Sequence, residues 1–416
     1  MATKRLSRIQ GVIIFIAILS MLLAGCGSSN SIKTGVGING TTINLGILTP
    51  LTGPVADPIG KPLTRGIEVF FKDINDNGGI DGYTVNLVEK DTKYDPTTEV
   101  TQYQAIRNQV LMIAESLGTP TTFAIKDLSA ADNMLVSAAT LSSALAYVPN
   151  LILVGTPYRL QVDNAFDYVV NQLHIQNPKT GIIYQGDDYG LDGLSGYQEA
   201  VNAYHLDDVG QASFTAGQQD ESAEVLQMKA AGAQYVFLTS TPADTATIML
   251  TAHALNYDPQ WILQSPAYSP LLLQVPGLAD LLQKEAWLVG QGATWGDTSK
   301  PGMARMLKDV QKYAPDQKPD GFFEFGYTEA MITYALLKKA ADNGDLTREG
   351  LINAFNNLTV DLGGLYPNIK YGTSANQRVP TRDNTIYAID ASSPGTVKPL
   401  TGDFTGSAAQ NADFTR

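Results

Sequence analysis

The chain has 416 residues, a formal net charge of −13 and one cysteine, Cys26. Because the charge is negative and no run of Lys or Arg occurs beyond the N-terminal segment, we expect no nucleic-acid partner. A single cysteine forms no internal disulfide, so the fold must depend on its hydrophobic core, and a chain of this length is ample for two lobes.

The first 25 residues have the pattern of a bacterial lipoprotein signal peptide. A basic start precedes an apolar run at residues 9–22, and Leu23-Ala24-Gly25-Cys26 has the form of a lipobox. The alternative is a transmembrane anchor, but the apolar run is shorter than the roughly 20 residues that span a bilayer. We therefore expect cleavage before Cys26, lipid attachment to Cys26, and an extracytoplasmic protein anchored to the bacterial cell membrane.

A flexible tether and then a first β-loop-α unit are predicted next. Residues 26–40 are rich in Gly, Ser and Asn, which is typical of a tether. Residues 42–48 are mostly apolar or β-branched and predict a buried strand, and a helical pattern at residues 63–77 ends at Gly78-Gly79. Because ligands bind beyond the carboxyl ends of the strands in α/β sheets, the loop at residues 50–60 is the first candidate wall of a binding site.

Strand and helix patterns alternate along the rest of the chain, which predicts parallel sheets with helices on both faces. An apolar run at residues 151–156, followed by Pro157, leads into a second set of such units. The predicted fold is therefore α/β, with two Rossmann-like lobes that each have a parallel central sheet. Strands are expected at residues 83–88, 110–115, 134–137, 181–185, 209–214, 235–239 and 260–264, and helices at residues 96–108, 121–131, 162–171, 195–204, 223–231, 243–255, 302–313 and 322–341.

Two stretches of the sequence resemble a known family. Pro50-Leu51-Thr52-Gly53-Pro54 with Asp73-Ile74-Asn75 and Gly78-Gly79-Ile80, and later Tyr184-Gln185-Gly186-Asp187-Asp188-Tyr189-Gly190, are similar to the type I periplasmic binding proteins of the leucine/isoleucine/valine-binding group. The similarity runs from about Thr42 to about Lys398.

The resemblance implies a Venus-flytrap architecture with a three-stranded hinge. Lobe one would comprise residues 41–158 plus 293–360, and lobe two residues 159–292 plus 361–400. The last residues, 401–416, are small and polar, and this composition predicts a disordered tail.

Catalytic and metal-binding patterns are missing from the sequence. His174, His205 and His253 lie far apart and share no metal-ligand spacing. Ser195 lacks the G-x-S-x-G elbow of a hydrolase. We therefore expect neither an enzyme nor a metal ion or other cofactor.

The strongest candidate for a binding loop is Gly118-Thr119-Pro120-Thr121-Thr122, which follows a strand and opens a helix. Thr119 suits the N-cap and Pro120 the first helical position, so a ligand carboxylate there would meet free backbone N–H groups, hydroxyls and the positive end of the helix dipole. Plain capping is the simpler explanation, but it needs one hydroxyl, whereas Thr119, Thr121 and Thr122 supply three. In the family that the chain resembles, a Ser/Thr-rich loop at this place holds the ligand carboxylate.

The resemblance implies further contacts. Ala139 and Thr140 match the family's second contact loop, Tyr189 matches a residue that caps the ligand, and Thr241 ends a strand of lobe two at a contact position.

The family's last contact is an acidic residue that pairs with the ligand's ammonium group. Here the matching segment, Gln264-Ser265-Pro266-Ala267-Tyr268, contains no carboxylate. A buried ammonium without a counter-charge is unfavourable, so we expect organic or aromatic carboxylates, enclosed by Tyr189 and Tyr268, to bind better than branched-chain amino acids. The alternative is that Asp187, Asp188 or Asp244 reaches an ammonium from a neighbouring loop.

The resemblance and the site residues together predict a monomeric solute-binding lipoprotein. It would close by hinge motion on a small amino-acid-like or organic carboxylate ligand and deliver it to the permease of an ABC importer. The alternative is a ligand-sensing ectodomain that reports to a membrane receptor without transport. Neighbouring permease and ATPase genes would favour the first function, and a neighbouring kinase or receptor gene the second.

Overall fold

The computed structural model describes residues 32–415. The predicted signal peptide, residues 1–25, and the predicted lipidation site, Cys26, lie outside the described residues. The fold given below is that of the unit that begins at Thr34. Among the helices of the described part, none has the length and apolar character needed to cross a bilayer.

The end of the predicted tether belongs to the fold. β2 (Ile38–Asn39) pairs antiparallel with β3 (Thr42–Thr49), and the Asn44 N–H donates to the Gly37 carbonyl at 2.8 Å. Gly37 has a φ of 88°, and a Cβ at this position would lie 2.0 Å from the Leu111 backbone nitrogen. The glycine that suggested a linker therefore serves a tight turn, and the prediction of a flexible tether is wrong for residues 37–40.

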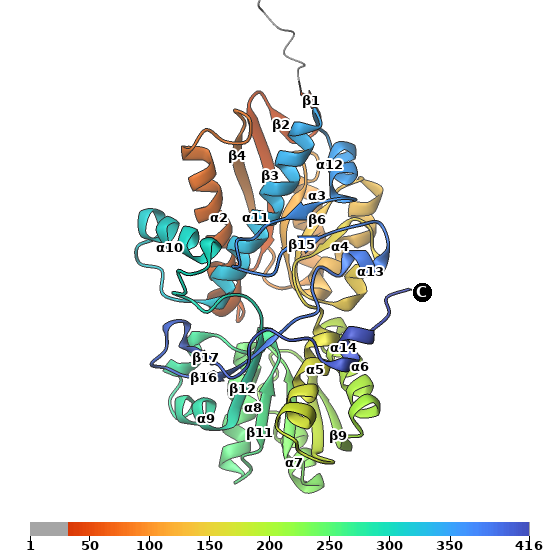
Figure 1. Ribbon diagram of the computed structural model, residues 1–416, viewed down its shortest axis with the longest axis vertical. Helices are drawn as coiled ribbons and strands as arrows, with labels where there is room; N and C mark the ends of the chain where they lie inside the picture. The colour runs from red at the N-terminus through yellow and green to blue at the C-terminus, as the bar shows by residue number, and fades with distance from the viewer. Residues whose placement is uncertain (1–31, 416) are drawn as a thin grey trace, which may run out of the picture. The chain divides into compact units, whose positions relative to one another are not determined.

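Lobe one is built on a six-stranded sheet whose long strands are parallel (Figure 1). β3 lies centrally and its residues from Ile43 onward are buried, as expected for the apolar run at this position. The parallel neighbours of β3 are β4 (Thr84–Asp91) and β5 (Ile113–Leu117), and the sheet continues through β6 (Val136–Ala139) to β7 (Leu151–Leu153).

Lobe two is built on a seven-stranded sheet in the order β17-β16-β12-β11-β10-β8-β9. Five strands are parallel, and β16 and β17 add an antiparallel edge. The strands are β8 (Lys179–Gln185), β9 (Asp207–Phe214), β10 (Tyr235–Thr239), β11 (Gln260–Leu263), β12 (Ala286–Gly290), β16 (Thr385–Ile389) and β17 (Val397–Pro399).

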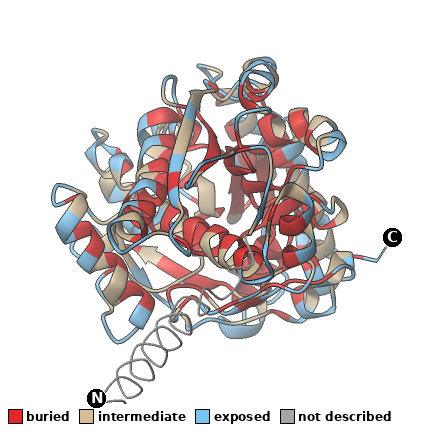
Figure 2. Cartoon of the chain, turned by 90° about the horizontal axis from the view of Figure 1, so that it is seen from above, coloured by how far each residue is buried: buried red, intermediate tan, exposed pale blue. Residues whose placement is uncertain are grey.

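Helices cover both faces of each sheet, which explains why the central strands are apolar on both sides. In lobe two, Ile183, Leu238 and Leu263 belong to the core on one face, and Ile182, Phe237 and Ile262 belong to the core on the other. Figure 2 shows buried residues along the strands and on the inward sides of the surrounding helices. Lobe one carries α2 (Lys61–Asp76), α3 (Pro96–Ile106), α4 (Thr119–Ala131), α10 (Pro301–Tyr313), α11 (Gly321–Asp342) and α12 (Arg348–Phe355), and lobe two carries α5 (Tyr158–Asp167), α6 (Asp188–Tyr204), α7 (Ser222–Ala231), α8 (Pro242–Ala254) and α9 (Leu278–Glu285).

The late helices return to lobe one, as the resemblance implied. α11 packs against α2 through two glycines. A Cβ on Gly66 would lie 2.2 Å from the Phe323 carbonyl oxygen, and one on Gly326 would lie 1.9 Å from the Leu63 carbonyl oxygen. The absence of side chains at these positions lets the two helices approach closely.

Three chain segments cross between the lobes, near Thr156, Gln291 and Asp383. Hydrogen bonds tie them together: the Thr156 N–H donates to Gln291 Oε1 at 2.8 Å, and the Thr156 hydroxyl donates to the Asp383 carbonyl at 2.6 Å. The three segments therefore form one hinge.

The third crossing lies later than predicted. β14 (Thr359–Val360) pairs with β15 (Ile369–Lys370), and the Tyr371 hydroxyl then donates to the carbonyl of Leu153 at the end of β7, at 2.7 Å. Arg378 Nε donates to the Ala146 carbonyl, also in lobe one, at 2.8 Å. The boundary at residue 361 is therefore wrong, because long-range contacts that leave no periodic pattern in the sequence hold residues 361–379 on lobe one.

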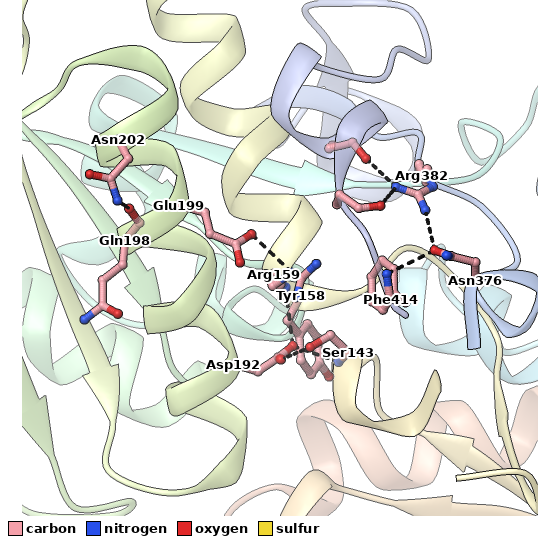
Figure 3. Close-up of polar contacts among 12 residues, drawn as sticks. Ser143, Tyr158, Arg159, Asp192, Gln198, Glu199, Asn202, Asn376, Arg382 and Phe414 are labelled. Carbon is pink, nitrogen blue, oxygen red and sulfur yellow. Dashed lines mark hydrogen bonds and ion pairs between the residues drawn. The ribbon is translucent and has the colours of Figure 1, made fainter. Parts of the chain in front are cut away.

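The prediction of a disordered tail is wrong for residues 401–415. α14 (Ser407–Asn411) packs on α5, and the Gly406 N–H donates to Asn164 Oδ1 at 2.8 Å. The Phe414 ring is fully buried, 4.6 Å from the Arg159 guanidinium and 5.4 Å from that of Arg382 (Figure 3). The Phe414 ring and the contacts of α14 together hold a segment whose overall composition is small and polar.

We predict that Phe414→Ala lowers the free energy of unfolding by about 3–5 kcal/mol, because the change removes a fully buried ring and leaves a cavity. Denaturant unfolding followed by circular dichroism measures this. Leu400→Ala is the matched control: Leu400 lies in the same C-terminal stretch but is 43% exposed, so the change should cost about 0.5 kcal/mol or less. Equal losses for the two variants would contradict an anchoring role for Phe414.

Candidate ligand-binding cleft

A cleft of about 1280 Å³, counting its solvent-open mouth, lies between the lobes beside the hinge. Residues of both lobes line it, and several of them follow the carboxyl ends of strands, where α/β sheets bind ligands. Among the described residues that line it there is no Lys, Arg or His, and Glu324 is the single acidic residue. Most of the wall is aromatic or apolar, contributed by Ile59, Leu63, Tyr94, Leu117, Leu141, Tyr158, Tyr189, Pro266, Tyr268, Leu288, Trp295, Phe322, Phe325, Tyr366, Tyr387 and Val397.

The loop between β5 and α4 brings two hydroxyls to the wall. α4 begins at Thr119, which was predicted to be the N-cap, and Gly118 is the N-cap instead, with no side-chain cap. The Thr119 and Thr140 hydroxyl oxygens lie 2.6 Å apart and are hydrogen-bonded to each other. Thr119, Ala139 and Thr140 all line the cleft, so the two predicted contact loops of lobe one meet there.

Thr121 and Thr122 do not reach the cleft. The Thr121 hydroxyl donates to the Leu117 carbonyl at 2.5 Å, and the Thr122 hydroxyl donates to the Ser116 carbonyl at 3.0 Å. Neither residue lines the wall. Their hydroxyls hold the loop that presents Thr119 by bonding its carbonyls, and neither caps the helix.

The predicted contacts from lobe two all lie on the wall. The Tyr189 hydroxyl donates to the Ser240 carbonyl at 3.2 Å, and the Thr241 hydroxyl donates to Asp244 at 2.7 Å. The Tyr268 hydroxyl pairs with that of Thr396 at 2.8 Å. These polar atoms already have partners in the protein, so the three side chains offer a ligand mainly their apolar surfaces.

Two aromatic rings of the wall contact each other beside the first hinge segment. The rings of Tyr158 and Tyr189 are 4.8 Å apart in an edge-to-face arrangement. Burial raises the pKa of Tyr158 to about 12 and that of Tyr189 well above its ordinary value of 10, so both phenols are neutral at physiological pH.

Sequence reasoning missed several wall residues. Tyr94, with a φ of 59°, lies just after β4, and a Cβ on Gly118 would come within 2.4 Å of its ring. Its position after a strand end could have identified it. Trp295 comes from the second hinge segment, and Glu324 comes from α11. No pattern in the sequence predicts that either residue lies at the cleft.

The acids considered as partners for an ammonium are held elsewhere. Asp187 caps α6 by accepting from the Tyr189 N–H at 3.0 Å, and Asp244 accepts from the Gly217 N–H at 2.9 Å. Asp187, Asp188 and Asp244 are not among the residues that line the cleft. In the segment 264–268, Ser265, Pro266 and Tyr268 reach the wall, and none carries a charge.

The two lobes also touch directly beside the cleft. Asp192 of α6 accepts a hydrogen bond from the backbone N–H of Ser143, in lobe one, at 2.9 Å, and a second from the Ser143 hydroxyl (Figure 3). The backbone N–H of Arg159 donates to the same carboxylate at 3.3 Å. Burial raises the pKa of Asp192, and these hydrogen bonds oppose the rise.

Residues 42–394 match the sequence profile of a family described as periplasmic binding protein, and the chain belongs to this family. The family membership confirms the predicted α/β fold and the prediction of a binding protein that is not an enzyme. It also agrees with an extracytoplasmic location.

Curated relatives match over part of the chain. The Leu/Ile/Val-binding protein homolog 3 of Brucella melitensis is 26% identical over 51% of this chain and 58% of its own length. The amino acid binding protein of Pseudomonas aeruginosa is 27% identical over 46% of this chain and 52% of its own length. The chain thus spans little more than half of these relatives.

Solved structures match over nearly the whole chain. A fatty acid ABC transporter substrate-binding protein from Thermomonospora curvata has a TM-score of 0.85 and 28% identity, covering 92% of this chain and 97% of its own. A branched chain amino acid ABC transporter protein from Thermus thermophilus with bound valine has a TM-score of 0.76 and 17% identity, covering 90% and 99%. The second likeness concerns the fold alone.

Proposed function

We propose that the protein is an extracytoplasmic solute-binding protein of an ABC importer and that its ligand is a monocarboxylate with an apolar body. The observation that carries this proposal is the cleft itself, in which a hydroxyl pair at a helix N-terminus lies in a mostly aromatic and aliphatic wall. A periplasmic binding protein of this kind would release its ligand to a membrane permease.

The carboxylate would bind at the start of α4. The dipole of this helix and its first backbone N–H groups favour a negative charge, and the Thr119 and Thr140 hydroxyls can turn from each other to donate to it. Since no Lys or Arg lines the described wall, these dipoles are the available source of positive potential.

The apolar body of the ligand would lie against the aromatic wall. Tyr158, Tyr189 and Tyr268 have their hydroxyls bonded to, or buried in, the protein, so they present rings. Each aromatic contact adds about 0.5–1.5 kcal/mol beyond the area that it buries. A hydrocarbon chain or an aromatic ring is therefore a better complement than a polar body.

The names of similar proteins support two ligand classes. The structure from Thermomonospora curvata is described as a fatty acid protein, whereas the curated relatives are named for amino acids. The uncharged segment 264–268 favours the first class, because an ammonium buried there would lack a counter-charge. An amino-acid-like ligand is the second candidate.

Binding would close the cleft about the hinge. A ligand that contacts both lobes stabilises the closed arrangement by the interactions that the open arrangement lacks. A ligand-sensing ectodomain without transport would use the same cleft. Uptake of the ligand by cells that carry the intact permease genes, lost on deletion of the binding-protein gene, distinguishes transport from sensing.

Calorimetry with a matched pair of ligands tests the ligand class. We predict that the hydroxy or keto acid with the carbon skeleton of leucine binds at least about tenfold more tightly than leucine. Thr119→Val, which keeps the shape and removes one donor, should weaken binding of the acid about ten- to a hundredfold. Thr101→Val, on the exposed face of α3, is the control and should have no effect. Micromolar binding of leucine without binding of the deaminated acid would refute the proposed class.

Membrane attachment is proposed through lipid on Cys26. Cys26→Ser should abolish metabolic labelling with a fatty acid and either release the protein from membranes or leave it unprocessed. Normal cleavage together with unchanged membrane retention of the variant would show that Cys26 is not the anchor.

A further inference from the structure

Glu324 is a buried carboxyl group on the cleft wall that the proposed function does not use. It lies in the first turn of α11, whose N-cap Asp320 accepts from the Phe322 N–H at 2.8 Å. Gly321, Phe322, Glu324 and Phe325 all line the cleft, so α11 begins at its wall. Glu324 is 6% exposed, and its Oε1 atom is buried without a hydrogen-bond partner among the described residues.

The surroundings of Glu324 are tight and largely aromatic. A Cβ on Gly292 would lie 2.9 Å from Glu324 Oε1 and 2.4 Å from the ring of Tyr366. Gly292 has a φ of 92°, which also favours glycine. The second hinge segment therefore passes close to the carboxyl group without a side chain, and Tyr366 flanks it.

The lack of a cationic side chain on the described wall favours the neutral, protonated form of Glu324. No Lys, Arg or His lines the cleft, so an ionised Glu324 would be a buried charge without a partner. Burial raises the pKa of Glu324 well above its ordinary value of 4.5, and the backbone amide of Ala293 opposes this only in part. A carboxyl group that keeps its proton has an O–H donor and an acceptor oxygen.

We propose that Glu324 is a second polar contact of the cleft, donating a hydrogen bond to an uncharged hydroxyl or carbonyl oxygen on the apolar body of the ligand. This inference rests on the proposed function, in which the ligand carboxylate lies at Thr119 and Thr140. The preferred ligands are then monocarboxylates with a further oxygen along the chain or ring. A buried polar group left unpaired is unfavourable, so Glu324 also discriminates against ligands that present only hydrocarbon to it.

An ionised Glu324 paired with a ligand ammonium is the competing arrangement. It would require two desolvated charges in place of two neutral groups, and the attraction between them does little more than offset that desolvation. The hydrogen bond between neutral groups avoids this penalty.

Calorimetry with straight-chain monocarboxylates and their hydroxylated counterparts, the hydroxyl moved stepwise along the chain, tests the inference. For wild type, one hydroxyl position should improve affinity about tenfold over the plain acid. Glu324→Leu should remove this preference and leave the plain acid bound at least as well. Glu324→Gln, which keeps a donor, should retain most of it. Glu329→Gln, a buried acid of the same helix that bonds Ser137 away from the cleft, is the matched control and should behave as wild type.

The outcomes separate this inference from the proposed function. If plain acids bind wild type and no hydroxyl position improves affinity, or if Glu324→Leu keeps the preference, Glu324 is not a ligand contact and the proposed function stands. If an amine-bearing ligand binds most tightly and Glu324→Gln abolishes its binding, Glu324 is a counter-charge and the inference is wrong. If no monocarboxylate binds folded wild type, both fail. Thermal unfolding establishes that each variant is folded.

Discussion

The hydrogen bonds of Thr156 join the three chain segments that connect lobe one to lobe two. Its backbone N–H and its hydroxyl reach the other two crossing segments, at Gln291 and Asp383, and no disulfide can replace these bonds because the only cysteine of the chain is Cys26. Gly155 makes the contact possible, since a Cβ there would lie 2.0 Å from Gln291 Nε2. The cleft, its aromatic wall and the contact of Asp192 with Ser143 all depend on this hinge for their positions.

A second constraint is that several hydroxyls of the cleft wall already have partners in the protein, whereas Glu324 Oε1 has none among the described residues. The hydroxyls of Thr119 and Thr140 bond each other, and those of Tyr189 and Tyr268 bond Ser240 and Thr396. A polar ligand body would have to displace the bonds of Tyr189 and Tyr268, whereas an apolar body leaves these intact. Selectivity for an apolar ligand body thus follows both from the residue types on the wall and from the hydrogen bonds that the wall hydroxyls make within the protein.

Local patterns predicted most of the fold, and long-range contacts account for what they missed. The apolar strand at Thr42–Thr49 and the loop before α4 follow from periodicity and turn residues, which act over short distances. Tyr371 and Phe414, by contrast, order their segments through contacts with distant parts of the chain. The resemblance therefore misplaced the third crossing, and composition misled at the tail. In the cleft, residues after strand ends were predictable, but Glu324 reaches the wall only because α11 packs on α2.

A crystal structure of the protein with a bound apolar monocarboxylate tests the proposed binding mode most directly. We predict carboxylate oxygens within hydrogen-bond distance of the Thr119 and Thr140 hydroxyls, and a hydrocarbon body in contact with rings from both lobes, including Tyr189 and Tyr268. A carboxylate held elsewhere on the wall, or a ligand that touches one lobe alone, would contradict it.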